Sequence, residues 1–202
     1  MIACFILMYF GTKLIKLLSK SKIYILGLVT LLVFPLPTLI YRLYFAKQEM
    51  LDMFYLGDFT SGALILGLSL GVVYALFSLL ALSSPVFDAL PNRIEALIQS
   101  MKLNLWDALF LSFCAGLGEE LLFRVGVQDF LGPLITSFIF IAIHGYFDPR
   151  SWRKSLYGVI LLPFILLISY GYTTFGLWFS VSAHFAYDFV LFYSIIKSKP
   201  TI

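Results

Sequence analysis

The sequence predicts an all-α fold, a polytopic bundle of transmembrane helices, and two observations support this prediction. The 202 residues are 61% hydrophobic and only 12% charged, with a mean hydropathy of +0.96. Soluble domains carry roughly 25% charged residues, so this composition is typical of an integral membrane protein. The apolar residues also gather in runs of the length, about 20 helical residues, that crosses a bilayer core of roughly 30 Å. Little sequence is left for a soluble part, so residues 1–202 are predicted to form a single integral membrane domain.

About six spans are predicted from the apolar runs that glycine, proline and charged residues separate. They cover residues 23–41, 61–82, 105–127, 130–146, 155–171 and 174–196. In the first run, LLVFPLPTLIY, Pro35 and Pro37 predict a kink.

Two further segments are predicted to lie at the membrane surface. The chain begins with MIACFILMYF and its lysines follow this run, so the first 20 residues resemble a retained interfacial segment more than a signal peptide. Residues 83–104 alternate apolar and charged side chains at helical spacing. This pattern indicates an interfacial amphipathic helix.

Lysine and arginine lie mostly on one side of the six predicted spans. That side holds eleven of them: Lys13, Lys16, Lys20, Lys22, Arg93, Lys102, Arg150, Arg153, Lys154, Lys197 and Lys199. The other side holds Arg42 and Lys47. Because basic loops stay in the cytoplasm, both termini are predicted to be cytoplasmic, and a prokaryotic cytoplasmic membrane is the expected location. The net charge of +3 then reflects topology and the lipid bilayer as partner, and no nucleic acid is expected.

Ionisable side chains lie at mid-depth in the last four spans, where each charge costs about 2.5–3.5 kcal/mol on insertion scales. They are Glu119, Glu120, Arg124, His144, His184 and Asp188. In GLGEELLFRVG, Glu120 and Arg124 are four residues apart and can form an ion pair within the helix. Glu119 points about 100° away, along a stripe of small residues that favours close approach of another helix.

The two histidines come from separate spans. FIFIAIHGYF places Phe140 and His144 four residues apart, and SVSAHFAYDF does the same for His184 and Asp188. Taken alone, either histidine could be a hydrogen-bonded packing residue, and a His–Asp bond within one helix would explain the second pair. With a rise of 1.5 Å per residue, however, Glu119 and both histidines reach similar depths and can converge in one buried pocket.

Such a pocket suits the activation of a water molecule for attack on a carbonyl carbon. A desolvated carboxylate is a stronger base, and an imidazole can orient the water or stabilise an oxyanion. The sequence has no GxSxG and no HExxH motif. A zinc site that Glu119, His144 and His184 would build from separate helices is an alternative.

Three short motifs carry a resemblance to a known family. EELLFR fits EExxxR, FIAIH fits FxxxH, and HFAYD fits HxxxN/D, in that order on three helices. In these motifs the chain resembles the CPBP family of intramembrane proteases, which includes the type II CAAX prenyl endopeptidases and the bacterial Abi and bacteriocin self-immunity proteins. The motif-bearing core helices cover residues 105–196.

The resemblance implies a role for each matching residue. Glu119 would be the general base on water, assisted by His144, while Glu120 and Arg124 support the site together with Phe140 of the second motif. His184 and the residue at position 188 would stabilise the tetrahedral oxyanion. Better-characterised family members use asparagine at this last position, and an ionised aspartate only accepts hydrogen bonds. Asp188 would therefore be protonated, or would orient His184.

The predicted function is that of a glutamate-dependent intramembrane endopeptidase. Its substrate would be a membrane-associated peptide or protein, lipidated or not, and no cofactor would be needed. Three alternatives stay open: a zinc-dependent protease using the same pocket, a non-catalytic immunity or scaffold protein of the same fold, and a proton pathway.

Overall fold

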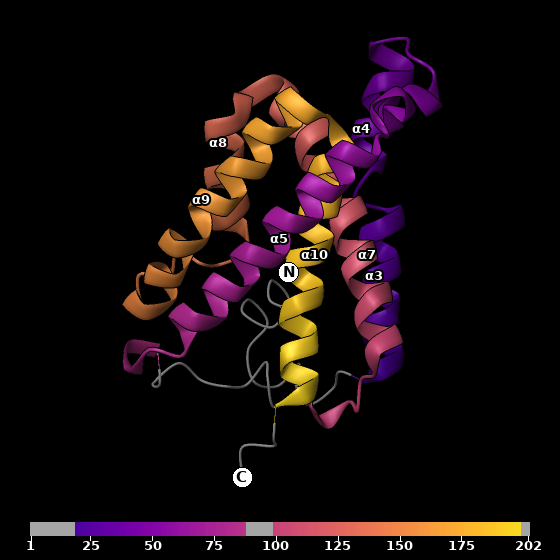
Figure 1. Ribbon diagram of the computed structural model, residues 1–202. Coiled ribbons are helices and arrows are strands. Elements are labelled where there is room, and N and C mark those ends of the chain that lie inside the picture. The colour runs from indigo at the N-terminus through magenta and orange to yellow at the C-terminus, as the bar shows by residue number, and fades with distance from the viewer. Residues whose placement is uncertain (1–18, 88–98, 199–202) are drawn as a thin grey trace.

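The computed structural model describes residues 19–87 and 99–198 as helices joined by short connections, and this part of the chain contains no strand (Figure 1). The predicted all-α bundle is confirmed. Most of both predicted interfacial segments, residues 1–18 and 88–98, lies outside the described residues. The principal helices are α3 (Lys20–Leu32), α4 (Leu36–Ile40), α5 (Ser61–Leu82), α7 (Leu105–Leu122), α8 (Gln128–Ile143), α9 (Trp152–Phe175) and α10 (Leu177–Lys197).

The first helical stretch is interrupted where its two prolines predict a kink. α3 ends at Leu32, and α4 begins at Leu36 with Pro35 as its N-cap residue. A π-helical segment, η1 (Tyr41–Phe45), follows directly. Two short 3-10 helices, η2 (Met50–Phe54) and η3 (Leu56–Asp58), then lead to α5.

α7 and α8 follow each other without a loop between them, and the chain folds back at a bend within α8. The π-helical segment η5 (Phe123–Val127) joins them. A straight helix would separate residues 119 and 144 by about 37 Å, yet Glu119 Oε2 lies 3.4 Å from His144 Nε2. The backbone turns at Gly132, whose φ of +73° is a left-handed value that glycine adopts readily, and Pro133 follows.

This bend affects how the spans are counted. Among the described residues, five helices are long and apolar enough to cross a membrane, and residues 105–143 count as one of them. The predicted number of about six spans corresponds to five such helices, because the predicted spans 105–127 and 130–146 both fall within residues 105–143, which bend at Gly132. The assignment of a multi-pass membrane protein does not depend on this difference.

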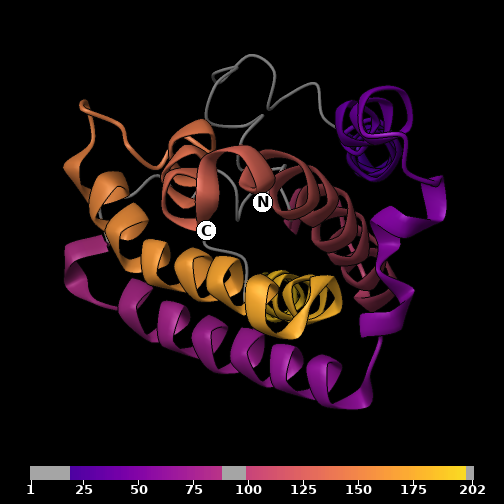
Figure 2. The same ribbon diagram turned by 90° about the horizontal axis from the view of Figure 1, so that it is seen from above.

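α10 lies at the centre of the bundle and packs against α5, α7 and α9, while α3 covers the far side of α7 and α8 packs beside α9 (Figure 2). Glycine allows the closest of these approaches. A Cβ added to Gly71 of α5 would collide with the carbonyl oxygen of Ala183 on α10, and one added to Gly118 of α7 would collide with that of Thr30 on α3. Small residues thus let α5 pack closely on α10, and α7 on α3.

Candidate active site

Glu119 lies near the end of α7 and is completely buried. Gly116, one turn earlier, would bring an added Cβ within 3.0 Å of the backbone nitrogen of Phe185 on α10. The predicted small-residue stripe therefore does lie where another helix approaches. Neither carboxylate oxygen of Glu119 has a hydrogen-bond partner within the described part of the chain. Glu119 is thus a buried acid whose hydrogen-bonding capacity is left for another group.

His144 follows the last residue of α8 and reaches Glu119 from that helix. Its Nδ1 lies 2.6 Å from the carbonyl oxygen of Phe140, and the two rings stack with their centroids 4.3 Å apart. A carbonyl oxygen only accepts, so Nδ1 carries the proton and donates it. This leaves Nε2 facing Glu119 Oε2 at 3.4 Å.

His184 lies on α10 and faces three carboxylates. Its Nδ1 donates to Glu120 Oε1 at 2.8 Å. Its Nε2 lies 3.6 Å from Asp188 Oδ2 and 3.8 Å from Glu119 Oε2, and has no hydrogen-bond partner among residues 19–87 and 99–198. The shortest of the three contacts comes from Glu120, so Glu120 on α7 orients this ring and Asp188 faces its other nitrogen.

Arg124 connects Glu120 to a wider buried network. Its Nε donates to Glu120 Oε2 at 2.7 Å, and both side chains are fully buried, so the ion pair predicted from their spacing is present. The guanidinium also lies over the ring of Phe140, 5.8 Å from its centroid. Glu120 therefore uses one oxygen for Arg124 and the other for His184.

Three polar residues that the sequence did not single out complete this network. Arg124 Nη1 donates to Gln128 Oε1 at 3.1 Å and to the hydroxyl of Ser169 on α9. Ser169 Oγ is also 2.8 Å from Ser137 Oγ on α8, and Gln128 Nε2 donates to the Ser169 carbonyl at 2.9 Å. Serine is common on membrane helices, so a serine can be assigned to a site only after the structure shows which side chain it contacts.

The arrangement calls for a proton donor at its centre. Glu119 Oε2 faces the Nε2 atoms of His144 and His184, and all three are acceptors when the histidines are neutral with a proton on Nδ1. Their separations of 3.4 and 3.8 Å exceed the 2.7–3.2 Å of an ordinary direct bond. A proton on Nε2, or a water bridging the atoms, would satisfy them.

A zinc ion would fit this cluster only in part. Ligands at the usual 2.0–2.2 Å from zinc lie roughly 3.4 Å from one another in a tetrahedron. The Glu119 and His144 atoms meet this spacing at 3.4 Å, whereas His184 Nε2 is 3.8 Å away. Within the described ranges, no group of three or more His, Cys, Asp or Glu side chains is arranged to hold a metal ion. The engagement of both Nδ1 atoms nevertheless matches the way zinc-bound histidines are usually held.

The fold thus brings together all seven residues that the sequence indicated: Glu119, Glu120, Arg124, Phe140, His144, His184 and Asp188. Residues 101–190, which include every one of them, match the family described as type II CAAX prenyl endopeptidase Rce1-like. Over these residues, a little under half of the chain, the sequence is similar to the Rce1-like family. The resemblance inferred from the three motifs is confirmed at the level of the family. Comparison with curated proteins and with solved structures gave no match.

The match to the Rce1-like family indicates a class of chemistry to which the cluster can be compared. Type II CAAX prenyl endopeptidases are peptide-bond hydrolases, so the family is a protease family. The match begins just before α7 and ends within α10. It therefore spans the three helices that carry the clustered residues together with α9, which supplies Ser169.

Proposed function

We propose that this chain is a glutamate-dependent intramembrane endopeptidase. One observation carries the proposal: Glu119 is fully buried, its two oxygens lack hydrogen-bond partners among the described residues, and it faces the Nε2 atoms of two histidines. A buried carboxylate without partners is costly, which favours a role that uses its free lone pairs. Binding and deprotonating a water is such a role.

The chemistry follows from the positions of the three groups. Glu119 removes a proton from the water as its oxygen attacks the carbonyl carbon of the peptide bond, and the carbonyl electrons move to the oxygen. His144, at 3.4 Å from Glu119, orients the water. The proton then passes from Glu119 to the amide nitrogen as the carbon–nitrogen bond breaks, so the products are a carboxylic acid and an amine.

His184 is proposed to stabilise the oxyanion. In its imidazolium form both ring nitrogens donate, and Nδ1 is already held by Glu120 at 2.8 Å. Asp188, 3.6 Å from Nε2, then adds a negative charge that stabilises the imidazolium. An ionised Asp188 therefore acts through His184 without donating a hydrogen bond itself.

The substrate is proposed to be a membrane-associated peptide or protein, lipidated or not, cleaved by the core helices within residues 105–196. The described basic residues support the proposed orientation, because Lys20 begins α3, Lys197 ends α10, and the loop from α8 to α9 lies at the same end of the bundle in Figure 1. That end would face the cytoplasm of a prokaryotic cell.

The test is Glu119→Gln, which keeps the shape of the side chain and removes its basicity. Cleavage of membrane proteins in cells that express either form is compared by quantitative proteomics of membrane peptides. The rate is expected to fall roughly 10²- to 10⁴-fold, the usual contribution of a general base. Glu49→Gln, at an exposed position in the loop before η2, is the matched control and should leave cleavage unchanged. Full cleavage by Glu119→Gln would refute the proposal.

A zinc-dependent mechanism is the second candidate, favoured by the way both imidazoles are held through Nδ1. It predicts stoichiometric zinc in the purified protein and loss of cleavage on chelation, with recovery when zinc is restored. Cleavage that persists in metal-free protein would refute it. A biological phenotype that survives Glu119→Ala would instead favour a non-catalytic immunity or scaffold role.

A further inference from the structure

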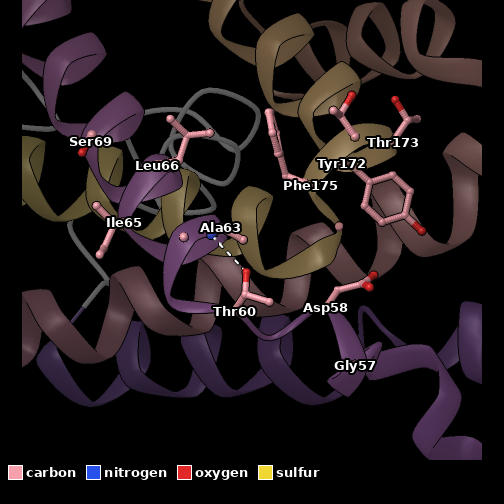
Figure 3. Close-up of a pocket in the computed structure, with 13 residues that line it drawn as sticks. Gly57, Asp58, Thr60, Ala63, Ile65, Leu66, Ser69, Tyr172, Thr173 and Phe175 are labelled. Atoms are coloured by element: carbon pink, nitrogen blue, oxygen red, sulfur yellow. Dashed lines mark hydrogen bonds between the residues drawn. The ribbon is translucent and has the colours of Figure 1, made fainter.

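A cleft of about 900 Å³ lies away from the candidate active site, at the end of the bundle where α9 meets α10 and α5 begins (Figure 3). Its lining comes from η3 and the start of α5 on one side and from the last turn of α9 on the other. None of the clustered site residues lines it. The proposed peptidase chemistry therefore leaves it without a role.

The cleft continues into a second hollow of about 350 Å³ deeper along the same helices. Leu66, Thr174 and Phe175 line both, so the two hollows adjoin. The second is bounded by Leu70 of α5 and Leu167 of α9 and is lined almost entirely by apolar side chains. The two hollows together form one groove that is polar at its mouth and apolar in its depth.

The length of this groove matches one leaflet of a bilayer. Thr60 caps the start of α5 at the mouth, and Leu70 lines the deep end. Ten residues of helix rise about 15 Å, which is half of a hydrocarbon core of roughly 30 Å. Ile65 and Phe175 are 63% and 45% exposed, so the groove also opens sideways to the surrounding apolar phase.

The mouth of the groove carries a carboxylate. Asp58 is exposed and makes no ion pair within the described part of the chain. It lies against the backbone of Gly176, where φ is +84°, because a Cβ added there would lie 2.7 Å from Asp58 Oδ2. Figure 3 shows Asp58 near Thr60, with Leu66 and Phe175 farther along the cleft. A negative group thus stands at headgroup level above an apolar channel.

We propose that this groove binds one phospholipid with an ammonium-bearing headgroup. The ammonium pairs with Asp58, and one acyl chain lies between α5 and α9 along Leu66, Leu70 and Phe175. Charge complementarity selects the headgroup, and burial of the chain against exposed apolar side chains supplies affinity without headgroup preference.

The test uses the full-length protein purified in detergent and native mass spectrometry to count bound lipid. The probes are phosphatidylethanolamine and phosphatidylglycerol with identical acyl chains. Phosphatidylethanolamine is expected to bind roughly fivefold more tightly, as one partly exposed ion pair allows. Asp58→Asn should remove this preference and leave phosphatidylglycerol binding unchanged.

A second pair of variants tests the groove itself. Leu66→Trp fills the channel and should reduce binding of both lipids, whereas Val73→Trp, at a 65% exposed position of α5 outside the groove, should not. If Leu66→Trp does not fold, Ser69→Trp blocks the same cleft. Equal binding of both lipids by the wild type, or full binding by the filled variants, would overturn the proposal.

Discussion

Two buried arginines in this bundle form clusters that differ in how completely their polar atoms are hydrogen-bonded. The outer arginine cluster is Arg42 with Gln48, Tyr55 and Asp129. Arg42 Nη1 donates to Gln48 at 2.6 Å, and Nη2 donates to Asp129 at 2.8 Å and to Tyr55 at 3.0 Å. Asp129 is 45% exposed, so water can also reach this cluster. Both terminal nitrogens of Arg42 thus donate to side-chain oxygens that can accept a hydrogen bond.

The inner arginine cluster is Arg124 with Glu120, His184 and Glu119. Its ion pair is fully buried, and yet Arg124 Nη2, His184 Nε2 and both Glu119 oxygens lack hydrogen-bond partners among the described residues. Each buried polar atom left unpaired costs about 1–3 kcal/mol. Both clusters contain an ion pair, so the ion pair does not distinguish them. The unpaired buried atoms of the inner cluster do, and they are the reason why we propose that the active site lies there.

Removal of the inner carboxylate should have the largest effect on stability. Glu120→Ala leaves Arg124 buried without its partner and frees His184 Nδ1, so the free energy of unfolding should fall by about 3–5 kcal/mol. Unfolding of the detergent-solubilised protein by denaturant measures this. The double variant Glu120→Met, Arg124→Met removes both charges and should recover most of the loss. A loss in Glu120→Ala no greater than that of Asp129→Asn would contradict the comparison.

Glu119→Gln should have the opposite sign. It replaces an unpaired buried acid with a neutral amide of the same shape, so the free energy of unfolding should stay equal or rise by about 1 kcal/mol while cleavage is lost. Parallel measurements of unfolding and cleavage on the same preparation test this. A large loss of stability would show that Glu119 holds the bundle together, and would count against its proposed role as a base.

The smallest effect is expected in the outer cluster. Asp129→Asn removes a partly exposed ion pair but leaves Arg42 bonded to Gln48 and Tyr55, so unfolding should change by at most about 1 kcal/mol. The change should shrink further at high salt, because exposed pairs are screened. Denaturant unfolding at low and high ionic strength provides the measurement. A salt-independent loss of several kcal/mol would erase the contrast between the two clusters.

Sequence spacing predicted much of the inner cluster. The four-residue interval between Glu120 and Arg124 places both on one helical face, and the small residues before Glu119 identify the face that meets α10. The contact between Glu120 and His184 was not predicted, because it depends on how α7 and α10 are rotated against each other. Ser169 could not be found either, since nothing in the apolar sequence of α9 indicates which hydroxyl meets an arginine.

For the fold, too, some features could be predicted from the sequence and others could not. Composition and run length predicted a helical membrane bundle, because both follow from the bilayer as solvent. The connection between α7 and α8 was predicted as a break between residues 127 and 130, with Gly132 and Pro133 inside the following span. Here the hydrogen-bonded stretch continues through η5, and the reversal is made by local backbone geometry without a separate loop.

The helical segment between the Gly132 bend and His144 also limits how the chain can change in length. Each residue inserted or deleted between this bend and His144 would turn the imidazole by about 100° around the axis of α8 and shift it by about 1.5 Å. A single-residue insertion between Pro133 and His144 would therefore point the ring away from Glu119. In the segment that leads to His144, the number of residues therefore matters more than the identity of most of them.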